Sequence, residues 1–518
     1  MNKKLQLFSL LTMIATATQN FALDLYGASL LSPRSQSTNA ARDMVGWHQF
    51  INLYDVHGGY KAGALTFEFT RTYRSRALAE FFFSTDNLFL SGSDVTNRGT
   101  EDLLADYFGL SQDFFGEAHL KPTMWNFIAD AEYYYGYYNW YIRAHAPLVV
   151  TRTHIEIEEV NDGAVDPFFP GYMGNKEVPV AYKSFRSAMT GTRGFGEVER
   201  LRYGKISCGP LRTVKLSDIQ VAVGNNFIND DDRHFGLNLR VSIPTGTRPD
   251  SEFLFEPIVG NGHHWELGIG LTSHILVWEK DDDQAINILV DANFMHLLRT
   301  RQRRSFDTLP KGRNCNRAFG DRYSLAKEFD CCGNYTGRTL PAINALTLCC
   351  DVYNVIQMDA ALLVAYQYKW FGFDIGYNAW LRTKDKIKCD SIRFPNHKYA
   401  FKGIQNVAAP DEQTTQSRAT LHGNTFNEQT EVADDPSPVF IKKKNINLMS
   451  AESPLSETHK FFWLMYFDSQ CAQADRLIPY FGFGGEVEFE GTRPKDVQPN
   501  YMSMAQWGIW FQTGFGWQ

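Results

Sequence analysis

The 518-residue sequence lacks any long apolar run beyond its N-terminal end. After Ala22 no stretch reaches the about 18 apolar residues that a membrane-crossing helix needs. Strong charge imbalance is also missing, since 21% of the residues are charged and the formal net charge is -7. A broad nucleic-acid-binding surface is therefore not expected, and there is no glycine-rich phosphate loop. These absences argue against a helical membrane protein and against a nucleotide- or nucleic-acid-binding protein.

The N-terminal end itself predicts export. Lys3 and Lys4 form a short positive region, and an apolar run over residues 5–17 follows it. Small residues at Ala15, Ala17 and Ala22 offer cleavage sites after Ala17 or after Ala22. This order is typical of a secretory signal peptide, which we expect to occupy residues 1–22.

Cysteine is scarce, and its spacing does not favour a metal site. The eight cysteines include two adjacent pairs, Cys331-Cys332 and Cys349-Cys350, without the two-residue spacer of zinc knuckles. The adjacent histidines His263 and His264 lie in a predicted loop and strand start, where a metal is not expected. We therefore expect neither metal nor cofactor. An even cysteine number in an exported chain suggests disulfides of undetermined pairing. The candidates are Cys208, Cys315, Cys331, Cys332, Cys349, Cys350 and Cys389.

Aromatic residues are abundant, at 14%, and many lie in segments of strict alternation. Over 235–243, Phe235, Leu237 and Leu239 alternate with small or polar residues, and Phe371 begins a similar segment. A period of two predicts β-strands. Twelve such strands are expected, at 65–73, 124–135, 138–150, 213–224, 234–244, 264–278, 285–299, 358–368, 371–384, 460–467, 477–490 and 503–517. Short links alternate with long ones, which are expected at 74–123, 151–212, 300–357 and 385–459.

The C-terminal segment carries the clearest family resemblance. Trp507, Ile509, Phe511, Phe515 and Trp517 alternate with glycine and glutamine. Here the chain resembles the outer-membrane β-barrel superfamily, although Gln518 follows the usual closing aromatic residue. The resemblance implies a single all-β, antiparallel, up-and-down barrel of about twelve strands, with ten or fourteen as alternatives. It further implies an outer-membrane location and contacts with membrane lipid, lipopolysaccharide and the barrel-insertion machinery. A homo-oligomer is compatible with it.

Two regions fall outside the strand pattern. Residues 23–60 precede the barrel, which we expect over 61–518, and Met44, Trp47 and Ile51 have helical spacing. A helix there would be either a plug in the lumen or a periplasmic helix, and the two alternatives stay open. Residues 386–458 are poor in large apolar residues and predict a solvated loop, not a separate folded domain.

Charged and polar residues on the inward strand faces are the candidate functional residues. The predicted pore-lining set is Glu68, Asp130, Glu132, Arg143, Arg240, Glu266, His274, Arg299, Arg301, Arg303, Asp374, Arg382, Glu486 and Glu488. Opposed charges across a watery lumen would select polar solutes; alternatively, they pair and fill the lumen. The arginine run 299–303 would also attract anions or bind lipopolysaccharide phosphate.

These patterns favour a channel for passive diffusion or uptake of small polar solutes. The alternative is an adhesin or structural protein that acts through its long loops. An integral hydrolase using His264 or His274 is the weakest hypothesis, because Ser273, which precedes His274, is expected to face lipid and no other adjacent serine is placed as a nucleophile. We therefore expect no catalytic residues and no enzyme.

Overall fold

A computed structural model describes residues 34–54, 58–83, 85–96, 102–174, 176–280, 283–308, 320–402, 440–468, 477–490 and 504–517. The predicted signal peptide, Cys315 and Cys471 lie outside these residues. The described residues form the α-helices α2 (Ser75–Phe83), α3 (Phe185–Ala188) and α4 (Ala342–Leu346). None of the helices in the described part of the chain has the length and apolar character to cross a membrane.

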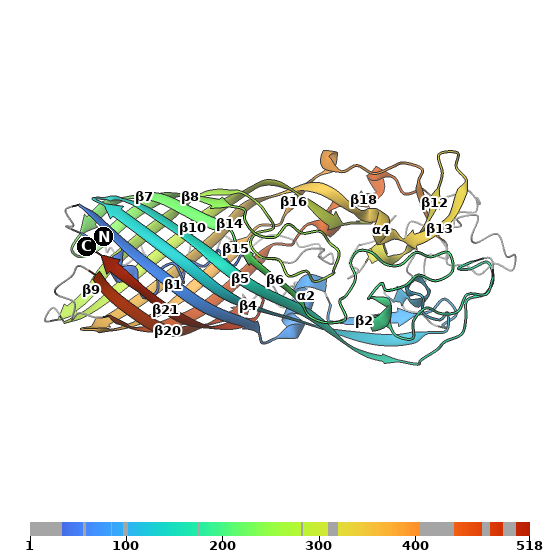
Figure 1. Ribbon diagram of the computed structural model, residues 1–518, viewed down its shortest axis with the longest axis horizontal. Coiled ribbons are helices and arrows are strands. Elements are labelled where there is room, and N and C mark those ends of the chain that lie inside the picture. The colour runs from blue at the N-terminus through green and yellow to red at the C-terminus, as the bar shows by residue number, and fades with distance from the viewer. Residues whose placement is uncertain are drawn as a thin grey trace, which may run out of the picture.

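The central feature is a closed antiparallel β-barrel of twelve strands (Figure 1). In order around the wall they are β1 (Gly59–Thr72), β4 (Phe115–Tyr137), β5 (Trp140–Asn161), β7 (Ile219–Asp230), β8 (Arg233–Ile243), β9 (Glu266–Lys280), β10 (Gln284–Ser305), β14 (Thr347–Tyr368), β15 (Phe371–Arg382), β19 (Ser456–Asp468), β20 (Leu477–Glu490) and β21 (Gln506–Trp517). The last strand pairs with the first, from Lys61↔Trp517 to Thr72↔Gln506. The predicted all-β barrel is confirmed, and every predicted strand overlaps an observed one.

One predicted strand is divided in two. The segment predicted at 213–224 is β6 (Leu211–Leu216) followed by β7, and both pair with β5. Ser217 and Asp218 lie between them and are fully buried. The interruption turns the side chain of Asp218 toward the interior, where Ser35 Oγ donates a 3.0 Å hydrogen bond to it.

The outer surface of the barrel is a band of large apolar side chains. Along β19, for example, Phe461 and Met465 are exposed while Phe462 and Leu464 are buried. Aromatic residues gather near the short turns, with Tyr138, Trp140, Trp278, Trp370 and Trp517 all exposed. An apolar band edged by aromatic residues is the surface that a lipid bilayer requires. The alternation in the sequence is therefore the alternation between lipid and interior.

The two ends of the barrel differ. Very short turns join β4 to β5 and β14 to β15, and each begins with a residue in the left-handed conformation, Tyr138 (φ 52°) and Lys369 (φ 52°). The C-terminal strand ends among these turns (Figure 1). At the opposite end, β4 and β5 continue far beyond the band and carry the long connections. By analogy with outer-membrane barrels, the short-turn end is periplasmic and the other is the outer end.

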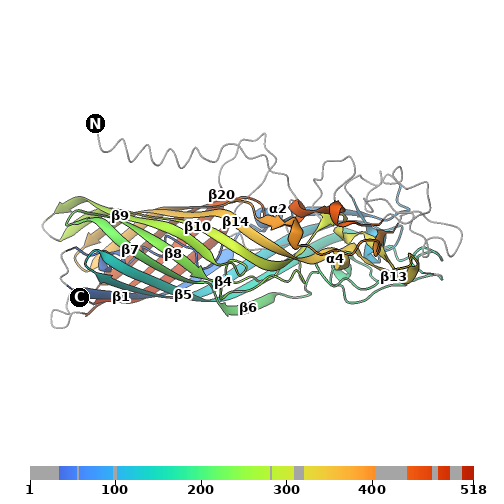
Figure 2. The ribbon, with the colours of Figure 1, turned by 90° about the horizontal axis from the view of Figure 1, so that it is seen from above.

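The long connections pack into a folded outer region, which we call the loop domain (Figures 1 and 2). It contains α2, α3, α4, β2 (Asn87–Ser91), β3 (Leu103–Leu104), β11 (Asp307–Thr308), β12 (Leu325–Phe329), β13 (Tyr335–Pro341), β16 (Lys386–Lys388), β17 (Tyr399–Phe401) and β18 (Ile446–Asn447). Its largest apolar cluster joins Phe82, Phe108, Phe185 and Phe255 from three separate connections. These loops therefore have a common core.

The expectation of a solvated loop over 386–458 is wrong for the parts that the structure describes. Ile387, Ile392 and Phe401 are buried with Ile441 and Ile446 in one apolar cluster. Few apolar residues are present, but they come together because β16 pairs with β14 and β17 pairs with β12. Residues 403–439 lie outside the described part.

The predicted disulfides are absent among the six described cysteines. All six are free, and only Cys350 is buried. The Sγ atoms of Cys331 and Cys332 are 3.9 Å apart, well beyond the about 2.05 Å of a disulfide bond.

Candidate functional site: the barrel lumen

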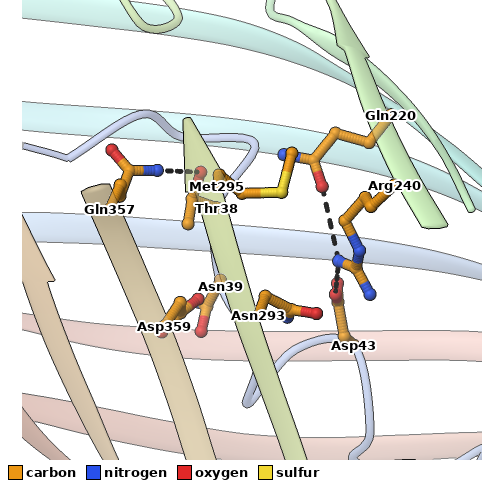
Figure 3. Close-up of a pocket in the computed structure, with 9 residues that line it drawn as sticks. All are labelled: Thr38, Asn39, Asp43, Gln220, Arg240, Asn293, Met295, Gln357 and Asp359. Atoms are coloured by element: carbon orange, nitrogen blue, oxygen red, sulfur yellow. Dashed lines mark hydrogen bonds and ion pairs between the residues drawn. The ribbon is translucent and has the colours of Figure 1, made fainter. Parts of the chain in front are cut away.

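Residues 34–54 lie inside the barrel, and we call them the luminal segment. They contact β1, β4, β14 and β15 of the wall. Figure 3 shows Thr38, Asn39 and Asp43 beside side chains of β7, β8, β10 and β14. The predicted helix is not continuous here. The segment forms successive turns and one 3₁₀ helix, η1 (His48–Phe50), since Gly46 adopts a left-handed conformation (φ 77°).

Arg42 anchors one side of the luminal segment. Its guanidinium group lies 2.6 Å from Glu68 of β1 and 3.0 Å from Asp130 of β4. All three side chains are almost fully buried. Buried carboxylates are very costly without a countercharge. Among the described residues, Arg42 is the only cation paired with Glu68, so this wall position depends on the segment for its charge balance.

Asp43 provides the opposite charge at the next position. Its carboxylate lies 3.1 Å from Arg240 of β8 (Figure 3) and 3.6 Å from Arg143 of β5. Arg143 also pairs with Glu132 at 3.0 Å, and its guanidinium group lies over the ring of Trp47. The segment thus offers a cation to an acidic part of the wall and an anion to a basic part. Such complementarity fixes the position of the segment.

The other side of the segment is apolar. Ala40, Ala41, Met44 and Val45 pack in one buried cluster with residues of β10, β14, β19 and β21. The wall residues in that cluster are Leu289, Ala361, Leu363, Ala365, Phe462, Leu464, Tyr466 and Trp510. These apolar residues face inward, which a water-filled pore would not favour. They are covered because the segment occupies the lumen.

Gly46 marks the closest approach between segment and wall. A Cβ atom there would lie 2.3 Å from Oε1 of Gln512 and 2.8 Å from Cδ2 of Leu464. The Gly46 amide donates a 2.8 Å hydrogen bond to Asp374 of β15, whose other oxygen lies 3.1 Å from His48. Left-handed backbone and close packing together require glycine at this position.

A cavity of about 340 Å³ opens at the periplasmic foot of the segment. His48 and Gln49 of the segment line it, together with His234, His274 and Asp291 of the wall. We call it the vestibule. Its volume is within the range that holds a small solute.

The structure places most of the predicted pore-lining residues inside the barrel. Ten of the fourteen are buried: Glu68, Asp130, Glu132, Arg143, Arg240, Glu266, Asp374, Arg382, Glu486 and Glu488. His274 is partly buried and faces the vestibule, where its Nδ1 contacts that of His234. Asp130, Glu132 and Arg143 come together around the segment, whereas Glu486 pairs separately with Lys460 at 2.6 Å.

The structure corrects the prediction for the other three residues. Arg299 and Arg301 are exposed and Arg303 is partly exposed, so they do not line the lumen. The β10–β14 pairing has two register shifts, and the second, between Leu297 and Thr300, places an extra residue in β10 and inverts its alternation beyond that point. A one-residue bulge moves each following side chain to the other face.

The shift brings Gln302 and Arg304 inward in their place. Arg304 and Arg382 both pair with the buried carboxylate of Asp385, at 3.1 and 2.9 Å. These three charges form a layer near the outer end of the lumen. Sequence alternation could not identify Arg304 as inward, because the bulge has no clear composition signal.

Neither candidate histidine has the surroundings of a hydrolase. His264 is fully buried, and its ring nitrogens contact Leu298 O at 2.7 Å and Gln302 Nε2 at 3.1 Å. His274 contacts His234. No serine or cysteine of the described chain is hydrogen-bonded to either imidazole. Asp230 pairs with Arg233 in an exposed turn, as expected for a hydrated hairpin.

The closed barrel, its apolar outer band and its polar, charged interior define a transmembrane β-barrel of the outer-membrane class. This class places the chain in the bacterial outer membrane.

Comparisons with known proteins give matches among solved structures only. No protein-family model matches the chain, and neither does any curated protein sequence. A solved outer-membrane channel from Pseudomonas putida F1 is 9% identical, with a TM-score of 0.32 over 90% of this chain and 97% of that one. A FadL homologue from Pseudomonas aeruginosa is 6% identical, with a TM-score of 0.27 over 89% and 90%. A TodX monoaromatic hydrocarbon channel mutant is 7% identical, with a TM-score of 0.25 over 89% and 91%. These low scores say nothing of solute or mechanism.

Proposed function

We propose that the protein is an outer-membrane channel for small solutes, and that the luminal segment closes it in this conformation. The observation that carries the proposal is a charged lumen filled by a separate segment, with a vestibule at its foot. The described residues of the segment, 34–54, take no part in the strand pairing of the wall. Its movement would open a passage without any change in strand pairing.

The energetics of the lumen support a movable segment. Arg42, Glu68 and Asp130 are desolvated when the segment is in place, and their ion pairs offset this cost. Water entering an opened lumen would hydrate the same charges. Opening would expose the apolar residues around Leu464, which are buried here, and this opposes opening. The closed and open arrangements therefore differ by a balance of opposing terms, as a gate requires.

Gly46→Val is expected to favour the open arrangement. Valine at a left-handed position costs on the order of 1–3 kcal/mol, and its side chain would collide with Gln512. We expect the open probability in planar-bilayer recordings to rise about tenfold or more, with steps that scale with salt. Gly333→Val is the matched control, because Gly333 also has a positive φ (83°) but nothing lies within 4 Å of its added Cβ.

A reversible tether tests whether the segment itself is the gate. Ser37 Oγ donates a 2.8 Å hydrogen bond to Ser217 Oγ, so cysteines at both positions are close enough to form a disulfide. In a background without native cysteines, Ser37→Cys/Ser217→Cys added to Gly46→Val should suppress conductance when oxidised and restore it when reduced. The conductance of Gly46→Val with only one of the two cysteines should not change when the reductant is added. Silence of every folded variant would contradict the channel proposal.

The loop domain supports a second candidate function, attachment through the cell surface. Its connections share a core of buried aromatic residues, including Phe82 and Phe255, which a simple covering of the lumen does not need. Under this alternative, a variant with silent conductance would still bind its surface partner. Binding measured on whole cells with and without the loop domain would separate the two functions.

A further inference from the structure

Five side chains form a continuous outward-facing row across five neighbouring strands near the outer end of the barrel. In register order they are Trp507 of β21, Arg71 of β1, Trp125 of β4, Arg152 of β5 and Arg212 of β6. We call them the arginine row. The three arginines and Trp507 are exposed, and Trp125 is partly exposed. These strands lie side by side on the barrel wall (Figure 1).

The row lies at the edge of the apolar band. Two residues toward the periplasmic side on the same strand faces are Phe69, Phe127 and Val214. The rings of Phe69 and Trp125 are 6.1 Å apart, and those of Phe69 and Trp507 are 5.9 Å apart. Two residues toward the outer side are Thr123 and His154, which are polar. Tryptophan and arginine at such a boundary lie at the level of the lipid head groups.

No carboxylate of the described residues balances the positive charge of the row. Arg152 and Arg212 are directly opposite each other in the β5–β6 pairing, an arrangement that like charges destabilise. No ion pair joins a described carboxylate to any of the three arginines, whereas outward Arg301 pairs with Asp351 at 3.3 Å. Arg152 lies over the ring of Trp125, 5.9 Å from its centroid, which orients its guanidinium group.

We propose that the arginine row binds the phosphate groups of lipopolysaccharide in the outer leaflet. An arginine pair at one cross-strand position matches a phosphate dianion, because guanidinium groups bind its oxygens bidentately. The indole faces of Trp125 and Trp507 cover the adjoining apolar part of the lipid. The site depends on the orientation of the barrel in the outer membrane and not on the channel function. We propose this phosphate site in place of the arginine run 299–303, because Arg301 of that run already pairs with Asp351.

The test measures binding of deep-rough lipopolysaccharide to the refolded full-length protein in neutral detergent, by native mass spectrometry. The triple variant Arg71→Gln/Arg152→Gln/Arg212→Gln should bind at least about thirtyfold more weakly, since hydrogen bonds to charged groups are worth about 1.5–3 kcal/mol each. Removing the phosphate groups from lipopolysaccharide should weaken its binding to the wild type by the same factor. It should not weaken binding to the triple variant any further. Arg301→Gln is the matched control and should bind as the wild type does.

Thermal unfolding separates binding from a structural role. In neutral phosphatidylcholine vesicles the triple variant should be at least as stable as the wild type, because repulsion between Arg152 and Arg212 is removed. Only in vesicles that contain lipopolysaccharide should the wild type be more stable to thermal unfolding than the triple variant. If the triple variant does not fold, Arg212→Gln alone carries the same comparison. Equal binding by folded variant and wild type would overturn the proposal. The proposal would also be overturned if phosphate removal weakened binding equally in the wild type and the variant. Preference of the wild type for a polyglutamate peptide over lipopolysaccharide would overturn it too, and would indicate a protein partner.

Discussion

At the residue scale, Glu256 of the loop domain shows how one buried carboxyl group responds to its surroundings. Its oxygens accept hydrogen bonds from the backbone amides of Glu252 (2.7 Å) and Asp250 (3.2 Å). Burial, together with the neighbouring carboxyl group of Asp250, raises the pKa of Glu256 to about 8. The folded loop therefore favours the protonated form of Glu256.

The sign of the resulting pH dependence follows directly. Between about pH 4.5 and pH 8 the unfolded loop binds fewer protons at Glu256 than the folded loop, so stability falls as the pH rises through this window. Glu256→Gln imitates the protonated form and should remove this term. We expect hydrogen-exchange protection of residues 248–260, corrected for intrinsic rates, to be equal in variant and wild type at pH 5 and higher in the variant at pH 8. Higher protection of the wild type at pH 8 would contradict the assignment.

At the scale of single elements, the bulge of β10 between Leu297 and Thr300 decides which charges enter the lumen. The inverted alternation exposes Arg301 and buries Gln302. In a cysteine-free background, Arg301→Cys should react rapidly with a membrane-impermeant maleimide in the folded protein, and Gln302→Cys should not. After denaturation both should react equally. The opposite pattern would mean that β10 runs without a bulge, as strict alternation predicted.

The same strand shows what could be predicted from the sequence. The strands follow from local alternation, because a lipid-facing side and an interior side impose period two on each segment. A bulge depends on pairing with β14, more than 40 residues away in the sequence, and leaves the composition of β10 unchanged. The inward apolar residues of β14 and β19, such as Leu363 and Leu464, were also missed. They oppose the luminal segment, and no local pattern predicts a contact with residues 34–54.

At the scale of the whole molecule, the barrel wall and the luminal segment are held by different kinds of interaction. Continuous cross-strand pairing joins β4 to β5 over 22 residue pairs, from Gly116↔Asn161 to Tyr137↔Trp140. The segment is held only by side-chain contacts and turns. Proteins open locally where the fewest interactions must break.

Amide hydrogen exchange of the wild type in detergent should therefore resolve two openings. We expect residues 34–54 to exchange at least about tenfold faster than the amides of β4 and β5, through an opening that leaves the barrel intact. The amides of β19 serve as the control, because they contact the segment but belong to the wall. Identical protection of segment and wall would mean that the segment leaves only when the barrel unfolds, and gating by its movement would then fail.

The pairing of β21 with β1 has a consequence for synthesis of the chain. The strand made last supplies twelve residue pairs to the strand made first, from Lys61↔Trp517 to Thr72↔Gln506. A chain cut short before Gln506 would leave β1 and β20 as two unpaired edges along an apolar surface, the arrangement most prone to aggregate. No partly translated chain can complete its wall. Closure of the wall therefore requires a chain that extends to the end of β21.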